Sequence, residues 1–235
     1  VPPVYYVDNP LGNCGGQTDC LTDLQTAVDS GTAEVRIVGN YIVKGTVTIT
    51  NPALMKFTGL PSSGLVSDSA ATCTDPMLIV KSPLTISNLK IDGTCGADHR
   101  PLIQVQTGGT PTLEYLTLVN GTIAIDISAD AGPSIIRFNH IADNASYAIK
   151  KAASSTLMDA FGNNFLKNNP AGVQVDCGST QKIDHNFWGT AILPSSSSYL
   201  CYPSDPFRLG AAGALRNPGV DGEIIDLSDA AQTHF

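Results

Sequence analysis

The most constraining feature of this sequence is a repeat of short apolar segments that begins near residue 77. Five apolar segments open the repeats, at residues 77–80, 102–105, 124–127, 148–151 and 172–175. Their starts lie 25, 22, 24 and 24 residues apart. A second segment follows each of them, alternates apolar and polar residues, and ends at a corner of polar or small residues. Alternation with a period of two indicates β-strands, because successive side chains of a strand point to opposite faces.

A fixed period of this length with short strands and polar corners predicts a solenoid, in which each repeat packs on its neighbours. Leucine-rich repeats have a similar period, but their spaced leucines and fixed asparagine are missing. We therefore predict an all-β fold, a single right-handed parallel β-helix whose rungs pair at a spacing of about 4.8 Å. Segments at 34–38, 46–49 and 54–57 extend the pattern toward the N-terminus, which gives about seven rungs.

Both ends of a solenoid need a cover, because an open sheet edge exposes unpaired backbone groups. Residues 20–29 are the best helix candidate, with Leu21, Leu24 and Val28 on one face and Thr18 or Asp19 as the N-cap. We expect residues 1–33 to form an N-terminal cap from a short strand at 5–7 and this helix, and residues 34–190 to form the rungs. Residues 191–235 lack the repeat and are expected to wrap over the C-terminal end, with a candidate linker from about residue 217.

Six cysteines stand at positions 14, 20, 73, 95, 177 and 201. No pair has the Cys-x-x-Cys spacing that is typical of a zinc site. The even number and the grouping along the chain predict the disulfides Cys14–Cys20, Cys73–Cys95 and Cys177–Cys201, although other connectivities and scattered buried thiols stay open. Disulfides persist in oxidising compartments, so we expect an exported protein that is extracellular or on a cell surface.

The composition limits the partners of the chain. A formal charge of −8 and a pI near 4.7 disfavour nucleic acid, because phosphate binding needs clustered Lys and Arg. The sequence has no run of about 18 apolar residues, so no membrane-spanning segment is predicted. Only 14% of the residues are charged, and this turn-rich composition favours an all-β extracellular protein.

Polar residues recur at the corners of the predicted rungs. We expect one residue of each repeat to stack in a polar corner column formed by Asn88, Tyr115, His140, Asn164 and Asn186. Stacked polar side chains can bond one another and the backbone of the bend, and Asn tolerates the left-handed conformation of tight corners. Trp188 follows the last member and is expected to cover the end of the core. Asn120 and Asn144 begin Asn-x-Ser/Thr sequons and are candidate glycosylation sites.

Several segments carry a family resemblance. Residues 4–8 and 23–28 are similar to the opening strand and capping helix of the right-handed parallel β-helix, or pectate-lyase-like, superfamily. Residues 186–189 resemble the Asn-Trp-Trp-Gly sequence that often closes such helices. The likeness covers nearly all of residues 4–209 and is greatest to exported, repeat-containing members on bacterial or archaeal surfaces. It implies the fold but leaves the function open, because this scaffold carries lyases, hydrolases, esterases, adhesins and inert stalks.

A pectate-lyase-like enzyme needs a Ca²⁺ ion held by several carboxylates and a basic residue that removes a proton from a uronate. The acidic residues of the repeats stand at differing rung positions and predict no convergent cluster: Asp92, Asp126, Asp143, Asp159, Asp176 and Asp184. The candidate bases, which have no evident partner in the sequence, are Arg100, Arg137, Lys150 and Lys151. The adjacent Asp-Asp and Gly-His motifs of polygalacturonase-like hydrolases are missing as well.

Histidines and aromatic residues supply the remaining candidates. His140 and His185 are expected about two rungs, roughly 10 Å, apart, so we interpret them as corner residues rather than ligands of one metal ion. His99 follows Asp98 in a predicted loop and is a candidate for binding a cation. The aromatic residues that could stack sugars on one face are Tyr115, Tyr147 and Phe161, with ordinary packing as the alternative.

These observations favour a non-catalytic extracellular β-helix module of a cell-surface or appendage protein, with a structural, adhesive or glycan-binding role. We predict no catalytic residue, no metal ligand and no cofactor, with Ca²⁺ kept as a candidate for a groove along the rod. The expected partner is a surface glycan or a neighbouring subunit in a homo-oligomer or filament. The alternative is a polysaccharide lyase or glycoside hydrolase that acts on an acidic polysaccharide.

Overall fold

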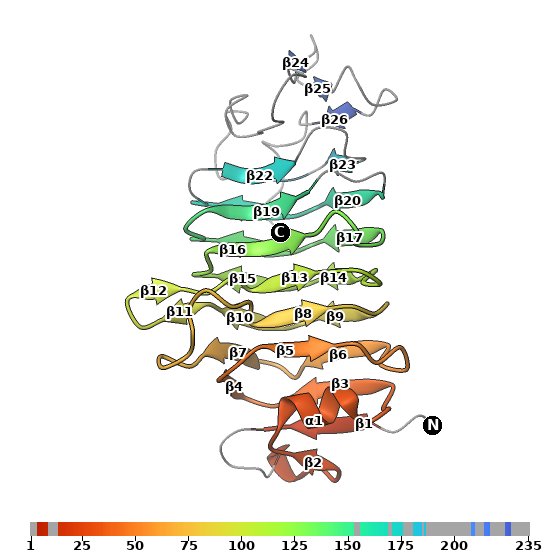
Figure 1. Cartoon of the computed structure of the whole chain (residues 1–235), viewed down its shortest axis with the longest axis vertical. Helices are drawn as coiled ribbons and strands as arrows, with labels where there is room; N and C mark the ends of the chain where they lie inside the picture. Colours follow the sequence, from red (N-terminus) through yellow and green to blue (C-terminus); the bar gives the residue numbers. More distant parts are fainter. Residues whose placement is uncertain are drawn as a thin grey trace.

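Parallel strands stack into three sheets in the computed structural model of this chain (Figure 1). The structure describes residues 4–8, 14–152, 156–168, 171–175, 181–184, 186, 208–209, 214–216 and 224–226. Sheet A has nine strands, in the spatial order β2-β1-β3-β6-β9-β14-β17-β20-β23. Sheets B and C have six strands each, in the orders β21-β18-β15-β10-β7-β4 and β22-β19-β16-β13-β8-β5. The predicted all-β fold with a parallel β-helix is confirmed.

The strands of the three sheets are short. Sheet A contains β1 (Val4–Val7), β2 (Cys20–Leu21), β3 (Glu34–Ile37), β6 (Lys56–Gly59), β9 (Thr85–Ser87), β14 (Thr112–Glu114), β17 (Ser134–Arg137), β20 (Met158–Phe161) and β23 (Gln181–Asp184). Sheet B contains β4 (Asn40–Val43), β7 (Gly64–Ser67), β10 (Lys90–Asp92), β15 (Thr117–Val119), β18 (His140–Ala142) and β21 (Asn164–Leu166). Sheet C contains β5 (Val47–Ile49), β8 (Leu78–Val80), β13 (Ile103–Val105), β16 (Ile123–Ile127), β19 (Tyr147–Lys151) and β22 (Ala171–Val175).

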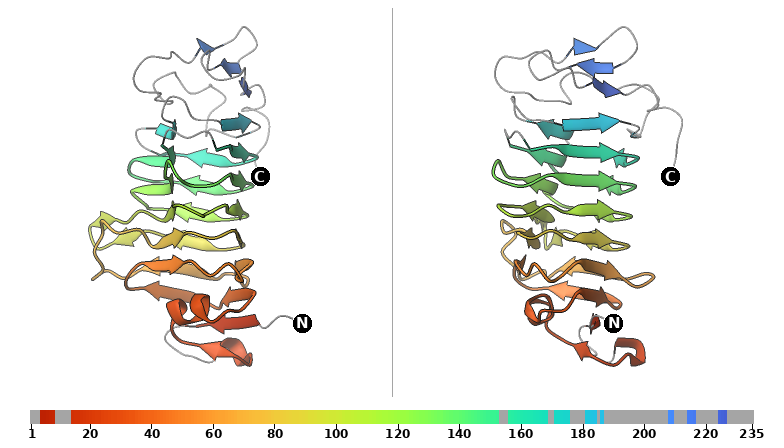
Figure 2. Two further views of the ribbon diagram at one scale, coloured as in Figure 1. Left: turned by 45° about the vertical axis from the view of Figure 1, so that its right-hand side comes forward. Right: turned by 90° about the vertical axis from the view of Figure 1, so that its right-hand side faces the viewer.

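The chain passes through sheets A, B and C in turn, so one strand from each sheet forms a rung. Within the described residues, six complete rungs begin with β3, β6, β9, β14, β17 and β20, and β23 begins a seventh. This number is close to the predicted seven. Figure 2 shows the rungs lying one above another along the length of the stack. Between β10 and β13 the chain leaves the stack as an antiparallel hairpin of β11 (Thr94–Cys95) and β12 (Asp98–His99).

Equivalent positions of successive rungs carry apolar residues, which form continuous columns inside the stack. The column of sheet A contains Val35, Phe57, Ile86, Leu113, Ile136 and Ala160. The column of sheet B contains Tyr41, Leu65, Ile91, Leu118, Ile141 and Phe165. The column of sheet C contains Val47, Leu78, Ile103, Ile125, Ile149 and Val173. Because burial of a large aliphatic side chain stabilises by about 1.5–3 kcal/mol, these columns hold the rungs together.

The N-terminal helix is shorter than predicted. Helix α1 (Leu24–Asp29) is capped by Asp23, whose Oδ1 accepts a 2.7 Å hydrogen bond from the Thr26 N–H. The prediction that the helix starts at residue 20 with Thr18 or Asp19 as its cap is wrong, because Cys20 and Leu21 pair with β1 as strand β2. The predicted strand at 5–7 is confirmed as part of β1.

Helix α1 lies against the first strand of sheet C at the N-terminal end of the stack (Figure 1). The side-chain amide of Gln25 pairs with Thr48 as a strand would, since its Nε2 donates to the Thr48 carbonyl at 2.9 Å and its Oε1 accepts from the Thr48 N–H at 2.8 Å. The Tyr41 hydroxyl accepts a bond from the Leu24 N–H at 3.1 Å. These contacts satisfy part of the sheet edge that would otherwise be open.

Two of the three predicted disulfides lie within the described residues, and both are confirmed. Cys14 pairs with Cys20, and Cys73 pairs with Cys95, with Cα–Cα distances of 5.7 and 5.8 Å. Cys177 and Cys201 lie outside the described residues, as do Trp188 and most of the expected C-terminal tail. Beyond residue 190 the described strands are β24 (Arg208–Leu209), β25 (Ala214–Arg216) and β26 (Ile224–Asp226), which pair antiparallel. No helix among the described residues is long and apolar enough to cross a membrane.

Candidate functional site

The corner between sheets A and B is built from two residues. The first residue has a positive φ, with values of 54° at Asn88, 54° at Tyr115, 57° at Phe138 and 64° at Gly162. This left-handed conformation suits Gly and Asn, but it is strained for bulky residues such as Tyr and Phe. The second residue of the corner is Leu89, Leu116, Asn139 or Asn163 in the same rungs, and all four are buried.

The asparagines at the second corner position form a hydrogen-bonded ladder along the stack, which we name the first ladder (Asn139, Asn163 and Asn186). The Asn163 Oδ1 accepts bonds from the Asn139 backbone N–H at 3.1 Å and from its Nδ2 at 2.9 Å. The Asn186 Oδ1 accepts the corresponding bonds from Asn163 at 2.8 and 3.0 Å. Each Nδ2 also donates to a strand carbonyl of the preceding rung, and Asn139 Oδ1 accepts from the Leu116 N–H at 2.9 Å.

The predicted polar corner column is therefore wrong in its register. Asn88 and Tyr115 stand at the first corner position, and Asn186 belongs to the ladder one position later. His140 and Asn164 lie one position further on, where they pair with each other as the first residues of β18 and β21. The reason is that Leu89 and Leu116 occupy the ladder position, so they resemble the inward strand residues Ile141 and Phe165 of later rungs.

A second ladder, formed by Asn144 and Asn168, stands at the corner between sheets B and C. Asn144 Oδ1 accepts from the Gly121 N–H at 2.9 Å, and Asn168 Oδ1 accepts from the Asn144 Nδ2 at 2.8 Å. The Asn144 Nδ2 also donates to the Ala142 carbonyl at 3.0 Å, and the side chain is 1% exposed. The prediction of a glycan on Asn144 is wrong, because the amide nitrogen that would carry it is buried inside the ladder. Asn120 is half-buried, and its Nδ2 donates to Asp92 Oδ1 at 3.1 Å.

Aromatic rings form a row on the outside of the first corner. The rings of Tyr115 and Phe138 are stacked, with centroids 5.5 Å apart and planes at 18°. The ring of Phe161 meets that of Phe138 edge-on, with a centroid distance of 5.4 Å. Tyr115 is 55% exposed. A Cβ at Gly162 would come within 2.8 Å of the Phe138 ring, so the glycine at this corner leaves room for the aromatic row.

The aromatic row differs from the predicted sugar-stacking group in one member. Tyr115 and Phe161 belong to it as expected, whereas Tyr147 is the first residue of β19 in sheet C. Phe138 links the other two rings and was missed, because its place beside Ile135 and Ile136 suggests an ordinary strand residue. The signal that identifies Phe138 is its position directly before Asn139, which matches Gly162 before Asn163.

Polar side chains of sheet B lie beside the aromatic row. Thr117, His140 and Asn164 stand at equivalent positions of three successive rungs. Together with Tyr115, Leu116, Phe138 and Asn139 they line an open pocket of about 440 Å³. Flat aromatic faces can pack against the apolar faces of sugar rings, and a hydroxyl, an imidazole and an amide supply donors and acceptors for sugar hydroxyls. We name this surface the aromatic corner.

Three of the four candidate bases are paired or buried. Arg137 lies in β17 beside the aromatic corner and forms an ion pair with Glu114 at 2.7 Å. Arg100 is 1% exposed, and its guanidinium donates to the carbonyls of Val43, Gly45, Asp75 and Pro76 at 3.0–3.2 Å. Burial lowers the pKa of Arg100, and the charge of Asp75 opposes that effect. Lys151 is buried at the inward position that Ile127 occupies in the preceding rung, whereas Lys150 is half-buried.

The carboxylates of the repeats are dispersed over the rungs. Asp92 has a strongly shifted pKa. Burial opposes its ionisation, but hydrogen bonds from Asn120, Lys90 and Thr94 outweigh this effect and lower the pKa to about 2. Asp126 and Asp159 belong to different sheets, Asp143 follows β18, and Asp176 lies outside the described residues. Within the described residues, no group of three His, Cys, Asp or Glu side chains could hold a metal ion.

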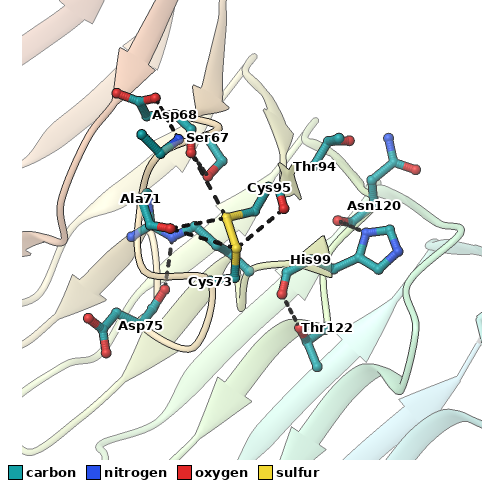
Figure 3. The surroundings of a disulfide bond; sticks show 12 residues. Ser67, Asp68, Ala71, Cys73, Asp75, Thr94, Cys95, His99, Asn120 and Thr122 are labelled. Atoms are coloured by element: carbon teal, nitrogen blue, oxygen red, sulfur yellow. Dashed lines mark hydrogen bonds between the residues drawn. A yellow bond between two sulfur atoms is a disulfide. The ribbon is translucent and has the colours of Figure 1, made fainter. Parts of the chain in front are cut away.

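The hairpin of β11 and β12 places His99 beside the Cys73–Cys95 disulfide (Figure 3). The Nδ1 of His99 lies 2.9 Å from the carbonyl oxygen of Asn120, and the Thr122 hydroxyl donates to the His99 carbonyl at 2.6 Å. Asp98 and His99 line a second open pocket, of about 580 Å³, with Cys73, Thr74, Pro101, Thr122 and Ala145. His140 is the first residue of β18, whereas His185, which is expected about two rungs away from it, lies outside the described residues.

Comparisons of the chain with protein-family models, with curated proteins and with solved structures found no match. The fold and the geometry of the aromatic corner are therefore the basis for any functional assignment.

Proposed function

We propose that this chain is a non-catalytic extracellular β-helix module of a cell-surface or appendage protein, and that its aromatic corner binds a glycan. The observation that carries the proposal is the placement of Tyr115 and Phe138. Both residues adopt a positive φ that costs them energy, and both present their rings beside a pocket with polar groups. Backbone strain at bulky surface residues is a reason to look for function at that place.

The repeat of the rungs supports a linear glycan as the ligand. Rungs stack at about 4.8 Å, so ring and polar side chain recur together at this spacing along the corner. Tyr115 and Thr117 belong to one rung, Phe138 and His140 to the next, and Phe161 and Asn164 to the third. A sugar chain lying along the rod would place the apolar face of a residue on a ring and its hydroxyls toward sheet B.

The two disulfides support an extracellular location. Disulfides form and persist in oxidising compartments. Cys14–Cys20 closes a short loop at the N-terminal cap, and Cys73–Cys95 joins the segment between β7 and β8 to the projecting hairpin. A rod with few charges and with loops fastened by disulfides is suited to an environment that contains proteases. We also keep the proposal of a pectate-lyase-like ancestry for this module, on the basis of the sequence resemblance alone.

The test is a glycan-array screen of the purified chain, followed by titration of the glycans that bind. Tyr115→Ala should weaken binding by on the order of tenfold, which corresponds to the loss of one stacking contact of ~1.4 kcal/mol. Tyr147→Ala is the matched control, because it removes a tyrosine from sheet C and should leave the affinity unchanged. Equal weakening by both variants, or no glycan binding by the wild type, would contradict the proposal.

The same protein preparation tests the alternative of an enzyme. Acidic polysaccharides are incubated with the chain, with and without Ca²⁺, and the products are examined for unsaturated ends and for new reducing ends. Release of either product would show a polysaccharide lyase or a hydrolase and would overturn the non-catalytic assignment.

A further inference from the structure

The corner that follows β15 contains Asn120-Gly121, which is the only Asn-Gly dipeptide in the 235 residues. Asn-Gly is the dipeptide most prone to spontaneous deamidation, because glycine leaves its own backbone nitrogen unhindered. That nitrogen attacks the side-chain carbonyl carbon of the preceding asparagine. Glycine is required here by packing, since a Cβ would come within 2.7 Å of Leu102 and within 2.9 Å of Asn144 Oδ1.

Hydrogen bonds hold both the nucleophile and the leaving group of this reaction. The Gly121 N–H, which would be the nucleophile, donates to Asn144 Oδ1 at 2.9 Å inside the buried second ladder. The Asn120 Nδ2, which would be the leaving group, donates to Asp92 Oδ1 at 3.1 Å. The Gly121 carbonyl accepts from the Ala145 N–H at 2.8 Å, and the Asn120 carbonyl lies 2.9 Å from Nδ1 of His99.

We propose that Asn120-Gly121 is a latent deamidation site, which stays unreactive only while Asn144 of the second ladder holds the Gly121 amide. When the ladder opens, a base in solvent removes the proton of the Gly121 N–H. The nitrogen then bonds to the Asn120 Cγ, the bond from Cγ to Nδ2 breaks, and the nitrogen leaves as ammonia after gaining a proton. Water then opens the cyclic imide at either carbonyl, which gives aspartate or isoaspartate at position 120.

The product makes an opening of this corner permanent. An isoaspartyl linkage adds one carbon to the backbone at a corner where Asn120 adopts the left-handed conformation, at a φ of 55°. Either product also places a second carboxylate beside Asp92, in place of an amide that donates to it. Like charges at this distance repel, so the hydrogen bonds around the corner would not re-form.

The test compares rates of deamidation in mildly alkaline buffer, measured by peptide mapping with separation of aspartate and isoaspartate at position 120. Folded wild-type protein should react at least about tenfold more slowly than a synthetic peptide with the sequence of residues 115–126, because the reactive N–H is engaged in a buried bond. An equal rate in protein and peptide would overturn the proposal without any need for a variant.

Two matched variants separate local opening from general loss of stability. Asn144→Ala removes the acceptor of the Gly121 N–H and should speed the reaction by on the order of tenfold. Asn163→Ala removes a similar amide from the first ladder, which does not touch Gly121, and should leave the rate near that of the wild type. If both variants react equally fast, or if Asn144→Ala is no faster than the wild type, the protective role of Asn144 is wrong.

Discussion

The corner between sheets A and B is constructed in two ways within one molecule. In the rungs that begin with β9 and β14, its second position holds Leu89 and Leu116. In the next two rungs the same position holds Asn139 and Asn163, which belong to the first ladder. All four side chains are buried, so the position tolerates both a leucine and an asparagine without a change of fold.

The backbone hydrogen bonds of the two constructions are the same. The carbonyls of Leu89 and Leu116 accept from the N–H groups of Thr117 and His140 at 3.0 and 2.8 Å, and the Asn139 carbonyl accepts from Asn164 at 2.8 Å. The asparagines add side-chain bonds to this common frame, whereas the leucines add buried apolar area. The corner therefore requires burial and satisfied polar groups, and two kinds of side chain can meet this requirement.

Substitution at the second corner position should cost more stability in the rungs with asparagine than in the rungs with leucine. Asn163→Ala removes the acceptor of two Asn139 donors and the donor to the Ile136 carbonyl, and it leaves these groups buried. We expect the free energy of unfolding to fall by about 4 kcal/mol, because each unsatisfied buried group costs about 1–3 kcal/mol. Denaturant unfolding measures this loss.

The control for this variant is Gln104→Ala, which removes an amide on the outer face of sheet C. That change should cost no more than about 0.5 kcal/mol, as is usual for surface substitutions. Equal losses for Asn163→Ala and Gln104→Ala would show that the ladder adds nothing to the common backbone frame.

Substitution of a corner leucine should lower the free energy of unfolding by less, and the position should tolerate an asparagine. Leu116→Ala leaves a cavity and should cost about 3 kcal/mol. Leu116→Asn should cost only about 1 kcal/mol, because the new amide can extend the first ladder by one rung and offsets part of the lost apolar burial. If Leu116→Asn is as damaging as Leu116→Ala in denaturant unfolding, the two constructions are not interchangeable.

The sequence predicts the rungs well, because a rung depends on local alternation that repeats along the chain. The corners are predicted less well, since their register depends on which residue turns inward. Asn139, Asn163 and Asn186 recur at intervals of 24 and 23 residues, so the first ladder is present in the sequence as a signal. It is hidden because Leu116 stands at the equivalent position one rung earlier. Asn144 is hidden in another way, because its sequon suggests a surface residue.

Arg100 shows what the sequence could not indicate. Its guanidinium is held by carbonyls of residues 43, 45, 75 and 76, which come from the end of β4 and from the segments that follow β4 and β7. Backbone carbonyls are common to all residue types, so no sequence pattern marks a group of them. The stacking of Tyr115 on Phe138 could not be derived from the sequence either. It requires both residues to adopt a positive φ at equivalent corners of successive rungs.

The smallest change in the free energy of unfolding is expected at the corner between sheets B and C. The charged group at this corner is the carboxylate of Asp92. Hydrogen bonds outweigh burial and hold the pKa of Asp92 at about 2, below its ordinary value of 3.8. A carboxyl group whose pKa is lower in the folded state stabilises the fold above pH 4, and the stabilisation is lost as the pH falls from about 4 to 2. We expect this contribution to be about 1 kcal/mol, because solvent screens a partly exposed group.

Asp92→Asn tests this difference between the corners. The free energy of unfolding is measured at neutral pH and near pH 2.5 for the wild type and the variant. The wild type should be the more stable at neutral pH, and the gap should shrink in acid, because the amide introduced by the substitution cannot gain a proton. A difference in stability that stays constant with pH would mean that Asp92 stabilises the fold through hydrogen bonds that do not depend on its charge, as the amides of the two ladders do. The charge would then contribute nothing to the second corner.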